Sequence, residues 1–305
     1  MKKKVIITGC NGFIGKRLVK FYNLKGYIVY GLGRKIEAST DYKNVTFYSC
    51  DLESEDTVNL YKSISPDIFI HCAGNANVGV SVEYPELDFE RNVGILYKTL
   101  SSIKRANIKP RFIFLSSAAV YGNPQILPIS ENQLNDPISP YGLHKKMCED
   151  LCKYFRNNYD MDILVVRIFS AYGNGLKKQI LWDMYNKYLR YGCIELFGTG
   201  YETRDFIHID DVVQALNLIE ETSSSDYIYN VANGEEISIG HLAEEFAKCL
   251  GLGKEKIKFN GKVKAGDPIN WRADITKLKE LGYCKSISLQ DGLKNYIDWV
   301  RKIVR

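Results

Sequence analysis

Short apolar runs recur through the first half of the chain, separated by longer stretches that carry apolar residues on one helical face. The runs that we interpret as buried strands are residues 5–8, 28–32, 45–49, 67–71, 111–115 and 163–168. The helical stretches include one that ends near Gly26, one over residues 88–108 and one over residues 140–159. Strands that alternate with helices in this way predict an α/β fold with a parallel, doubly wound sheet.

The alternation loosens after residue 169. We expect helices over residues 179–191 and 238–250, strands over 194–197 and 227–231, and a closing helix that ends near Val304. No repeat or clear linker marks a boundary. We therefore predict a sheet domain over residues 1–169 and a smaller α/β lobe over 170–305, interleaved with segments that return to the sheet.

A glycine-rich turn joins the first predicted strand to the first helix. The glycines of Gly9-Cys10-Asn11-Gly12-Phe13-Ile14-Gly15 permit a tight turn and let the backbone approach a pyrophosphate at the helix N-terminus. The alternative is a merely structural turn. Its place between a strand and an amphipathic helix favours dinucleotide binding, and hence a Rossmann-type domain.

The residues after the second strand bear on the choice of cofactor. NAD-binding domains place an acidic residue there for the ribose hydroxyls, whereas an arginine accommodates a 2′-phosphate. Here Gly33 takes that place and Arg34 follows, so the sequence favours NADP(H), with NAD(H) possible if another residue holds the ribose.

Other predicted cofactor contacts follow the next strands and open a helix. Asp51-Leu52 can reach an adenine amino group, and Ala73-Gly74 let a cofactor lie close because they carry little side chain. Asn92 falls in the first turns of the helix over 88–108. In a doubly wound sheet, ligands bind at the carboxyl ends of the strands, where these residues fall.

Tyr141 and Lys145 are spaced to stand one turn apart on one face of the helix that starts at Pro140. A free tyrosine has a pKa near ~10, and an ammonium group held close favours its phenolate form. The pair is therefore a candidate proton-transfer device, although such a spacing alone proves little.

Composition and charge exclude some classes of function. The net charge of +5 suits an anionic small substrate, and the basic residues form no stripe typical of nucleic-acid binding. The apolar run after Lys4 is too short for a signal peptide or a membrane span, so we expect a cytoplasmic protein without membrane contact. The eight cysteines and four histidines show no metal-binding spacing, and we expect no metal.

Six motifs in order resemble the extended short-chain dehydrogenases/reductases, in particular their nucleotide-sugar epimerase, dehydratase and reductase group. The motifs are Thr8–Gly15, Asp51-Leu52, His71–Gly74, Ser116-Ser117 before Val120-Tyr121-Gly122, Tyr141-x-x-x-Lys145, and Arg204-Asp205-Phe206-Ile207-His208. The resemblance covers nearly the whole chain.

This resemblance implies a role for each motif. Tyr141 would be the general acid/base, Lys145 would lower its pKa and hold the nicotinamide ribose, and Ser117 would hydrogen-bond the reacting oxygen. Ser116 would contact the cofactor, and Arg204 would grip a substrate diphosphate unless it pairs with Asp205 or Asp210. Further substrate contacts are expected from Ser170, Phe197 and Arg272, with Lys264 as an alternative to Arg272 and a plain core role as the alternative for Phe197. The resemblance also implies a homodimer and a nucleotide-diphosphate sugar as substrate.

Departures from the family patterns narrow the reaction. The dehydratases carry an Asp-Glu pair where this chain has Ala118 and Ala119, so elimination of water is not expected. The 4-epimerases usually have Asn at the position of Ser170 and an acid near Gly33. We therefore expect NADPH-dependent reduction of a nucleotide-linked 4-keto-sugar. The alternatives are a 4-epimerase with tightly bound NAD and a non-catalytic dinucleotide sensor.

Overall fold

A seven-stranded parallel sheet forms the centre of the protein, in a computed structural model that describes residues 2–36, 42–262 and 266–304. Its strands in spatial order are β11 (Ile228–Val231), β6 (Ile163–Ile168), β5 (Arg111–Ser117), β4 (Ile68–His71), β1 (Lys4–Thr8), β2 (Ile28–Gly33) and β3 (Val45–Ser49). The six expected strands and the parallel, Rossmann-type fold are confirmed. β11, from the second half of the chain, extends the sheet beside β6.

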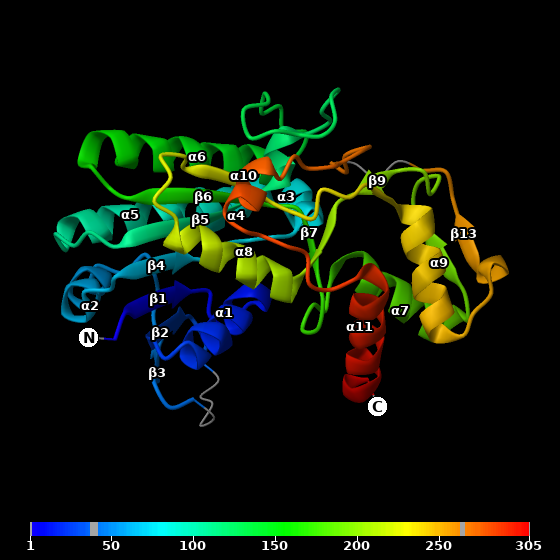
Figure 1. Cartoon of the computed structure of the whole chain (residues 1–305), viewed down its shortest axis with the longest axis horizontal. Helices are drawn as coiled ribbons and strands as arrows, with labels where there is room; N and C mark the ends of the chain where they lie inside the picture. The colour runs from blue at the N-terminus through cyan, green and yellow to red at the C-terminus, as the bar shows by residue number, and fades with distance from the viewer. Residues whose placement is uncertain (1, 37–41, 263–265, 305) are drawn as a thin grey trace.

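Helices cover both faces of this sheet (Figure 1). One face packs against α1 (Phe13–Leu24), α8 (Ile209–Glu221) and α10 (Thr276–Glu280) through one apolar core. The other face packs against α2 (Asp56–Ile64), α5 (Ile95–Arg105) and α6 (Pro140–Tyr159) through a second core. Each sheet strand contributes alternate side chains to the two cores, which explains why the strands read as continuous apolar runs.

The helix expected over 88–108 is divided. It begins as α4 (Pro85–Phe89), passes through a π-helical turn over Glu90–Gly94, and continues as α5, which ends at Arg105. A short helix α3 (Val78–Glu83) precedes it. Such π turns inside helices are rare and cannot be read from apolar spacing, which stays helical on both sides.

A smaller lobe lies beyond the carboxyl ends of the strands (Figure 1). Its helices α7 (Gln179–Tyr191), α9 (Ile239–Leu250) and α11 (Leu289–Ile303) share a third core. Its strands form three small pairs: β7 (Ser170–Tyr172) with β10 (Phe206–His208), β9 (Thr203–Arg204) with β12 (Ile237–Ser238), and β8 (Ile194–Leu196) with β13 (Ile257–Phe259). The division of the chain at residue 169 stays a prediction.

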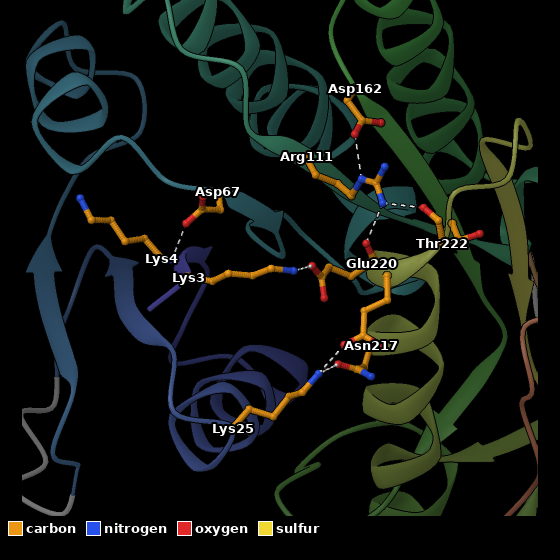
Figure 2. A network of polar contacts seen from close by, with 10 residues as sticks. Lys3, Lys4, Lys25, Asp67, Arg111, Asp162, Asn217, Glu220 and Thr222 are labelled. Carbon is orange, nitrogen blue, oxygen red and sulfur yellow. Dashed lines mark hydrogen bonds and ion pairs between the residues drawn. The ribbon is translucent and has the colours of Figure 1, made fainter. Parts of the chain in front are cut away.

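The C-terminal end of α8 contacts the amino-terminal ends of the sheet strands (Figure 2). Arg111 bonds the Asp162 carboxylate at 2.7 Å and the carbonyl oxygens of Glu220 and Thr222 at 2.8 and 2.6 Å. Lys3 pairs with the Glu220 carboxylate at 3.3 Å. These contacts hold α8, from the second half of the chain, on the first half. They lie at the amino-terminal ends of the strands, whereas the candidate site lies at the carboxyl ends.

Candidate active site

The glycine-rich turn forms a cradle at the start of α1. Gly9 has a φ of +61°, and a Cβ there would meet backbone atoms of Cys72 and Ala73 at 2.9 Å. A Cβ on Gly15 would lie 2.2 Å from the Gly9 carbonyl oxygen. Gly12 caps α1 without a side-chain hydrogen bond, so the first N–H groups of the helix are left for an anion such as a pyrophosphate.

Residues after β4 face this cradle across the point where the strand order reverses, between β1 and β4. Gly74 has a φ of +142°, and a Cβ there would lie 2.7 Å from Asn92 Oδ1. That Oδ1 atom is buried and has no hydrogen-bond partner among the described residues, while the Asn92 amide donates to Asp88. The predicted contacts Ala73, Gly74 and Asn92 are thus brought beside the loop that carries Asn11 to Ile14.

The adenosine end is more open. Asp51 and Arg34 are exposed and Leu52 is buried, at the carboxyl ends of β2 and β3. The Asn11 side chain donates to the Lys35 carbonyl oxygen, and Cys50 N–H donates to the Gly33 carbonyl oxygen at 3.0 Å. These bonds gather the segments around Gly33 without committing the Arg34 side chain.

The N-terminus of α6 is held by serines on both sides of Tyr141. Ser139 Oγ accepts from Gly142 N–H, and Ser81 Oγ accepts from Tyr141 N–H, both at 3.1 Å. A Cβ on Gly142 would lie 2.4 Å from the Ala119 carbonyl oxygen, so the glycine lets α6 approach the turn after Ser117. Neither Ser81 nor Gly142 was predicted from the sequence to have a role at the site.

Ser117, Tyr141 and Lys145 converge at this contact. Lys145 is buried and donates to the Leu115 carbonyl oxygen at 2.9 Å, with its Nζ 5.9 Å from the centre of the Tyr141 ring. Ser117 Oγ accepts from Ala119 N–H at 3.2 Å and stays half-buried. Ala118 and Ala119 lie buried in that turn, where a dehydratase would carry acids.

A buried carboxylate behind α6 was also missed by sequence reasoning. Asp88 accepts from the Asn75 amide at 2.5 Å and lies 2.6 Å from His144 Nδ1. Asp88 therefore joins the loop after β4, the π-helical turn and α6. Its partners are 13 and 56 residues away in the sequence, and only a long-range contact map could have paired them.

His71 at the end of β4 is a neutral support for the site. Its Nδ1 lies 3.2 Å from Thr8 Oγ1, which in turn accepts from Ala73 N–H. Burial, helped by the nearby Lys145 ammonium, lowers the pKa of His71 to about 3 from an ordinary value of 6.5. The imidazole therefore stays uncharged in the folded protein while it is charged in the unfolded chain at mildly acidic pH.

This difference makes stability depend on pH. Because the folded pKa of His71 is depressed, its contribution is complete above pH 6.5 and is lost as pH falls toward 3. Between pH 7 and pH 5 the loss is about 2 kcal/mol. In urea unfolding, the wild type should be more stable than His71→Asn, and this difference in the free energy of unfolding should be about 2 kcal/mol smaller at pH 5 than at pH 7. A gap that is constant or wider at pH 5 would contradict the assignment.

On the substrate side, Arg204 is the cation best placed for a ligand. Its guanidinium donates to the carbonyl oxygens of Thr203 and Ile269 at 2.8 and 3.3 Å and lies 5.6 Å from the Trp271 ring. Burial lowers the pKa of Arg204, with Asp267 and Glu202 opposing that effect. Among the residues that the structure describes, Arg204 forms no ion pair.

The two acids expected to compete for Arg204 are engaged elsewhere. Asp205 accepts from the N–H groups of Asn233, Gly234 and Ala273, and burial raises its pKa to about 7 against the effect of these bonds. Asp210 forms a two-pronged ion pair with Arg17 of α1. The ion-pair alternative for Arg204 is therefore wrong.

The remaining predicted substrate residues are spread around the lobe. Ser170 is half-buried and its N–H donates to the Asp205 carbonyl oxygen at 3.0 Å. Phe197 is 51% exposed, so the alternative of a plain core residue is wrong. Arg272 is half-buried beside Trp271, and Lys264 lies outside the described residues.

Within residues 2–36, 42–262 and 266–304, no cluster of three or more His, Cys, Asp or Glu side chains is arranged to hold a metal ion. In the same part of the chain, no helix is long and apolar enough to cross a membrane.

A dinucleotide cradle beside a Ser–Tyr–Lys group defines an NAD(P)-dependent enzyme of the short-chain dehydrogenase/reductase type. The chain belongs to the NAD dependent epimerase/dehydratase family, whose profile matches residues 5–232. A putative UDP-glucose 4-epimerase of Methanocaldococcus jannaschii is 28% identical over 303 residues, covering 97% of this chain and 98% of that protein.

Solved structures give the same class over nearly the whole length. The UDP-glucose 4-epimerase of Thermotoga maritima, with UDP-glucose, has a TM-score of 0.89 at 27% identity and covers 99% of this chain and 100% of its own. The UDP-glucuronic acid 4-epimerase of Bacillus cereus, with UDP-glucuronic acid and NAD, has a TM-score of 0.89 at 27% identity and covers 98% and 99%. The protein is therefore an enzyme of this class, and the sensor alternative is set aside.

Proposed function

We propose that the enzyme is a nucleotide-sugar 4-epimerase that uses NAD. The observation that carries the proposal is the buried Lys145 held against both the Leu115 carbonyl and the Tyr141 ring, next to Ser117 and the dinucleotide cradle. The similarity to UDP-sugar 4-epimerases supports the epimerase over the reductase that the sequence favoured. The NADP(H) preference expected from Arg34 finds no support in relatives that bind NAD.

The residues of the cradle fit a dinucleotide. The N–H groups at the start of α1 suit a pyrophosphate, and glycines at positions 9 and 15 occupy space that a Cβ would fill. When bound, NAD would supply the hydride acceptor and donor for C4 of the sugar. The protein's part is then to hold the cofactor, orient the sugar and move one proton.

That proton transfer falls to Tyr141. Its phenolate would take the proton of the 4-hydroxyl group as general base and return it as general acid. Lys145 Nζ lies 5.9 Å from the centre of the Tyr141 ring, and Ser117 Oγ would hydrogen-bond the oxygen on C4 of the sugar. Ala118 and Ala119 cannot transfer protons, so the oxidised sugar would not lose water at this site.

Arg204 would bind the substrate diphosphate. Its guanidinium donates to carbonyl oxygens and lies by the Trp271 ring, and no described carboxylate forms an ion pair with it, although Asp267 and Glu202 act on it at longer range. A diphosphate offers two anionic groups for such a guanidinium. We assign UDP as the nucleotide by similarity to the relatives, and leave glucose-type and glucuronate-type sugars as the two substrates to test.

The test is conversion without added cofactor. Purified enzyme incubated with UDP-glucose or UDP-glucuronate should give the 4-epimer of one of them, followed by NMR of the anomeric protons. The dinucleotide released on denaturation should have the mass of NAD. If neither sugar is epimerised, but a UDP-linked 4-keto-sugar is reduced with consumption of NADPH, the result would instead support the reductase, for which the exposed Arg34 is the specific evidence.

We also propose a homodimer formed through α4, α5 and α6. Apolar side chains are exposed on these helices: Phe89 (41%), Tyr97 (51%), Leu143 (45%), Met147 (40%) and Tyr154 (52%). A second copy would cover them as the family resemblance implies. Light scattering should give twice the chain mass, and a monomer at micromolar concentration would contradict the dimer. The cytoplasmic location stays a prediction.

A further inference from the structure

A buried ion pair between Glu149 and Arg167 lies about two helical turns beyond Tyr141, where α6 packs on β5 and β6. The Glu149 carboxylate accepts from Arg167 Nε at 3.0 Å and from Arg167 Nη2 at 2.6 Å, a two-pronged geometry. Both residues are nearly inaccessible, at 6% and 3% exposure. Two charges removed from water in this way are costly unless each neutralises the other, so the pair holds α6 firmly on β6.

The carboxylate is also tied to the strand that carries Ser117. Ser116 Oγ donates to Glu149 Oε1 at 2.5 Å, and Lys145 Nζ donates to the neighbouring Leu115 carbonyl oxygen at 2.9 Å. Lys145 and Glu149 are four residues apart, on successive turns of one helix face. The ammonium group and the carboxylate thus contact consecutive residues of β5, with the carboxylate on the side away from Tyr141.

Arg167 is held from further elements. Its Nη1 donates to Tyr121 Oη at 2.8 Å and to the Glu131 carbonyl oxygen at 2.9 Å, and its guanidinium lies 4.8 Å from the Tyr121 ring. Tyr121 in turn donates to Asn230 Oδ1 at 2.7 Å. The guanidinium therefore has a fixed position between β6, β11 and the turn after β5.

We propose that Glu149 and Arg167 are positioning residues for Tyr141 and Lys145. The carboxylate fixes the rotation of α6 against Ser116 and Ser117, and the guanidinium cancels the charge that the carboxylate would otherwise place behind Lys145. The electrostatic field on the Tyr141 hydroxyl is then set by Lys145. This inference rests on the role proposed for Tyr141, but its test reads the ionisation of Tyr141 and not turnover.

Other titratable groups around α6 could also affect the ionisation of Tyr141, so a test of the ion pair must leave them unchanged. They are His71 and Cys72 at the end of β4, Asp88 in α4 with its partner His144, Cys148 and Cys152 on α6, Tyr121 after β5, and Glu131 next to Arg167. The variants below leave all of them unchanged.

Removing only the carboxylate charge gives a shift of definite sign. In Glu149→Gln the guanidinium stays protonated at every accessible pH and becomes an unpaired cation. Glu149 lies eight residues from Tyr141, about 12 Å along the helix axis. At that distance an unpaired charge should lower the ionisation midpoint of Tyr141 by about one pH unit. The amide that replaces the carboxylate can still accept from Ser116 Oγ, so α6 keeps its rotation and only the charge changes.

The measurement is the near-ultraviolet absorbance of tyrosinate during a pH titration of the enzyme as purified. For each protein, the titration curve of the same protein carrying Tyr141→Phe is subtracted. The difference is the signal of Tyr141 alone among the 21 tyrosines. Glu149→Gln should lower the midpoint by about one pH unit. Arg167→Lys, which keeps the charge, should leave it in place, and the double variant Glu149→Gln/Arg167→Met should restore it.

If Glu149→Gln does not fold, Arg167→Met provides the test with the opposite sign. It leaves the carboxylate unpaired, and the midpoint should rise by a similar amount. An unchanged or raised midpoint in Glu149→Gln overturns the proposal, as does an unchanged or lowered one in Arg167→Met. If the wild-type enzyme epimerised neither sugar, that would count against the proposed function. It would not change the interpretation of the Tyr141 titration.

Discussion

Replacing Tyr141 by phenylalanine should lower kcat for 4-epimerisation by about a thousand-fold, because general acid/base catalysis contributes about 10²–10⁴ to such rates. The ring stays buried next to Lys145, and only the hydroxyl is lost, so the packing of α6 should not change. Affinity for NAD should stay within about threefold, since the phenol is only one of the cofactor contacts. The kcat is measured from epimer formation and the affinity by calorimetry on cofactor-stripped enzyme.

Tyr154→Phe is the matched control for this substitution. Tyr154 lies on the same helix, 13 residues after Tyr141, and is 52% exposed on the surface proposed for the dimer. Tyr154→Phe keeps the ring that this surface needs and removes only a hydroxyl, so kcat should stay unchanged. If Tyr141→Phe retained kcat within twofold of wild type, the proton-transfer role would be wrong. If instead both kcat and cofactor affinity fell together, Tyr141 would be a binding residue.

The sheet could be predicted because its signal is local. Each parallel strand is buried on both faces, so it reads as an uninterrupted apolar run, and the glycine-rich turn marks its carboxyl end. Two of the helices that sequence reasoning missed, α2 and α8, were also within reach. Ile209, Val212, Val213 and Leu216 of α8 are all buried at helical spacing, but the motif that precedes them had been interpreted only for its chemistry.

The support around the catalytic residues could not be predicted in the same way. His144 pairs with Asp88 across 56 residues, Arg167 with Glu149 across 18, and His71 with Thr8 across 63. Each of these side chains is polar and gives no periodic signal. Their partners are set by the order of strands in the sheet, which brings β1 beside β4 and β5 beside β6.

The choice of reductase over epimerase rested on Ser170, on the acid missing at Gly33 and on Arg34, and the fold explains why Arg34 was weak evidence. Arg34 is exposed at the end of β2, just before residues 37–41, which lie outside the described part of the chain. An exposed arginine costs nothing to keep without a ligand, so its presence does not commit the site to a 2′-phosphate. Full-length similarity to UDP-sugar 4-epimerases is the stronger observation.

Gly15→Ala should weaken dinucleotide binding by on the order of 100-fold while the protein stays folded. The added Cβ would lie 2.2 Å from the Gly9 carbonyl oxygen and 2.9 Å from Cys10 Cα, so backbone must move. Moving the turn away from α1 removes one or two charge-assisted hydrogen bonds to the pyrophosphate, each worth about 1.5–3 kcal/mol. Calorimetric titration with NAD measures the loss, and far-ultraviolet circular dichroism checks the fold.

Gly79→Ala separates this steric effect from the general cost of changing a glycine. Gly79 is exposed in α3, and a Cβ there would meet its nearest neighbour, Asn77 Oδ1, at an ordinary 3.4 Å. Its NAD affinity should therefore match wild type. If Gly15→Ala bound NAD within threefold of wild type, the glycine-rich turn would not be the pyrophosphate site. NAD binding would then not depend on the close approach of α1 to Gly9. Weak binding in Gly15→Ala alone would locate the pyrophosphate at that turn, the same edge of the sheet at which Tyr141 and Lys145 meet Ser117.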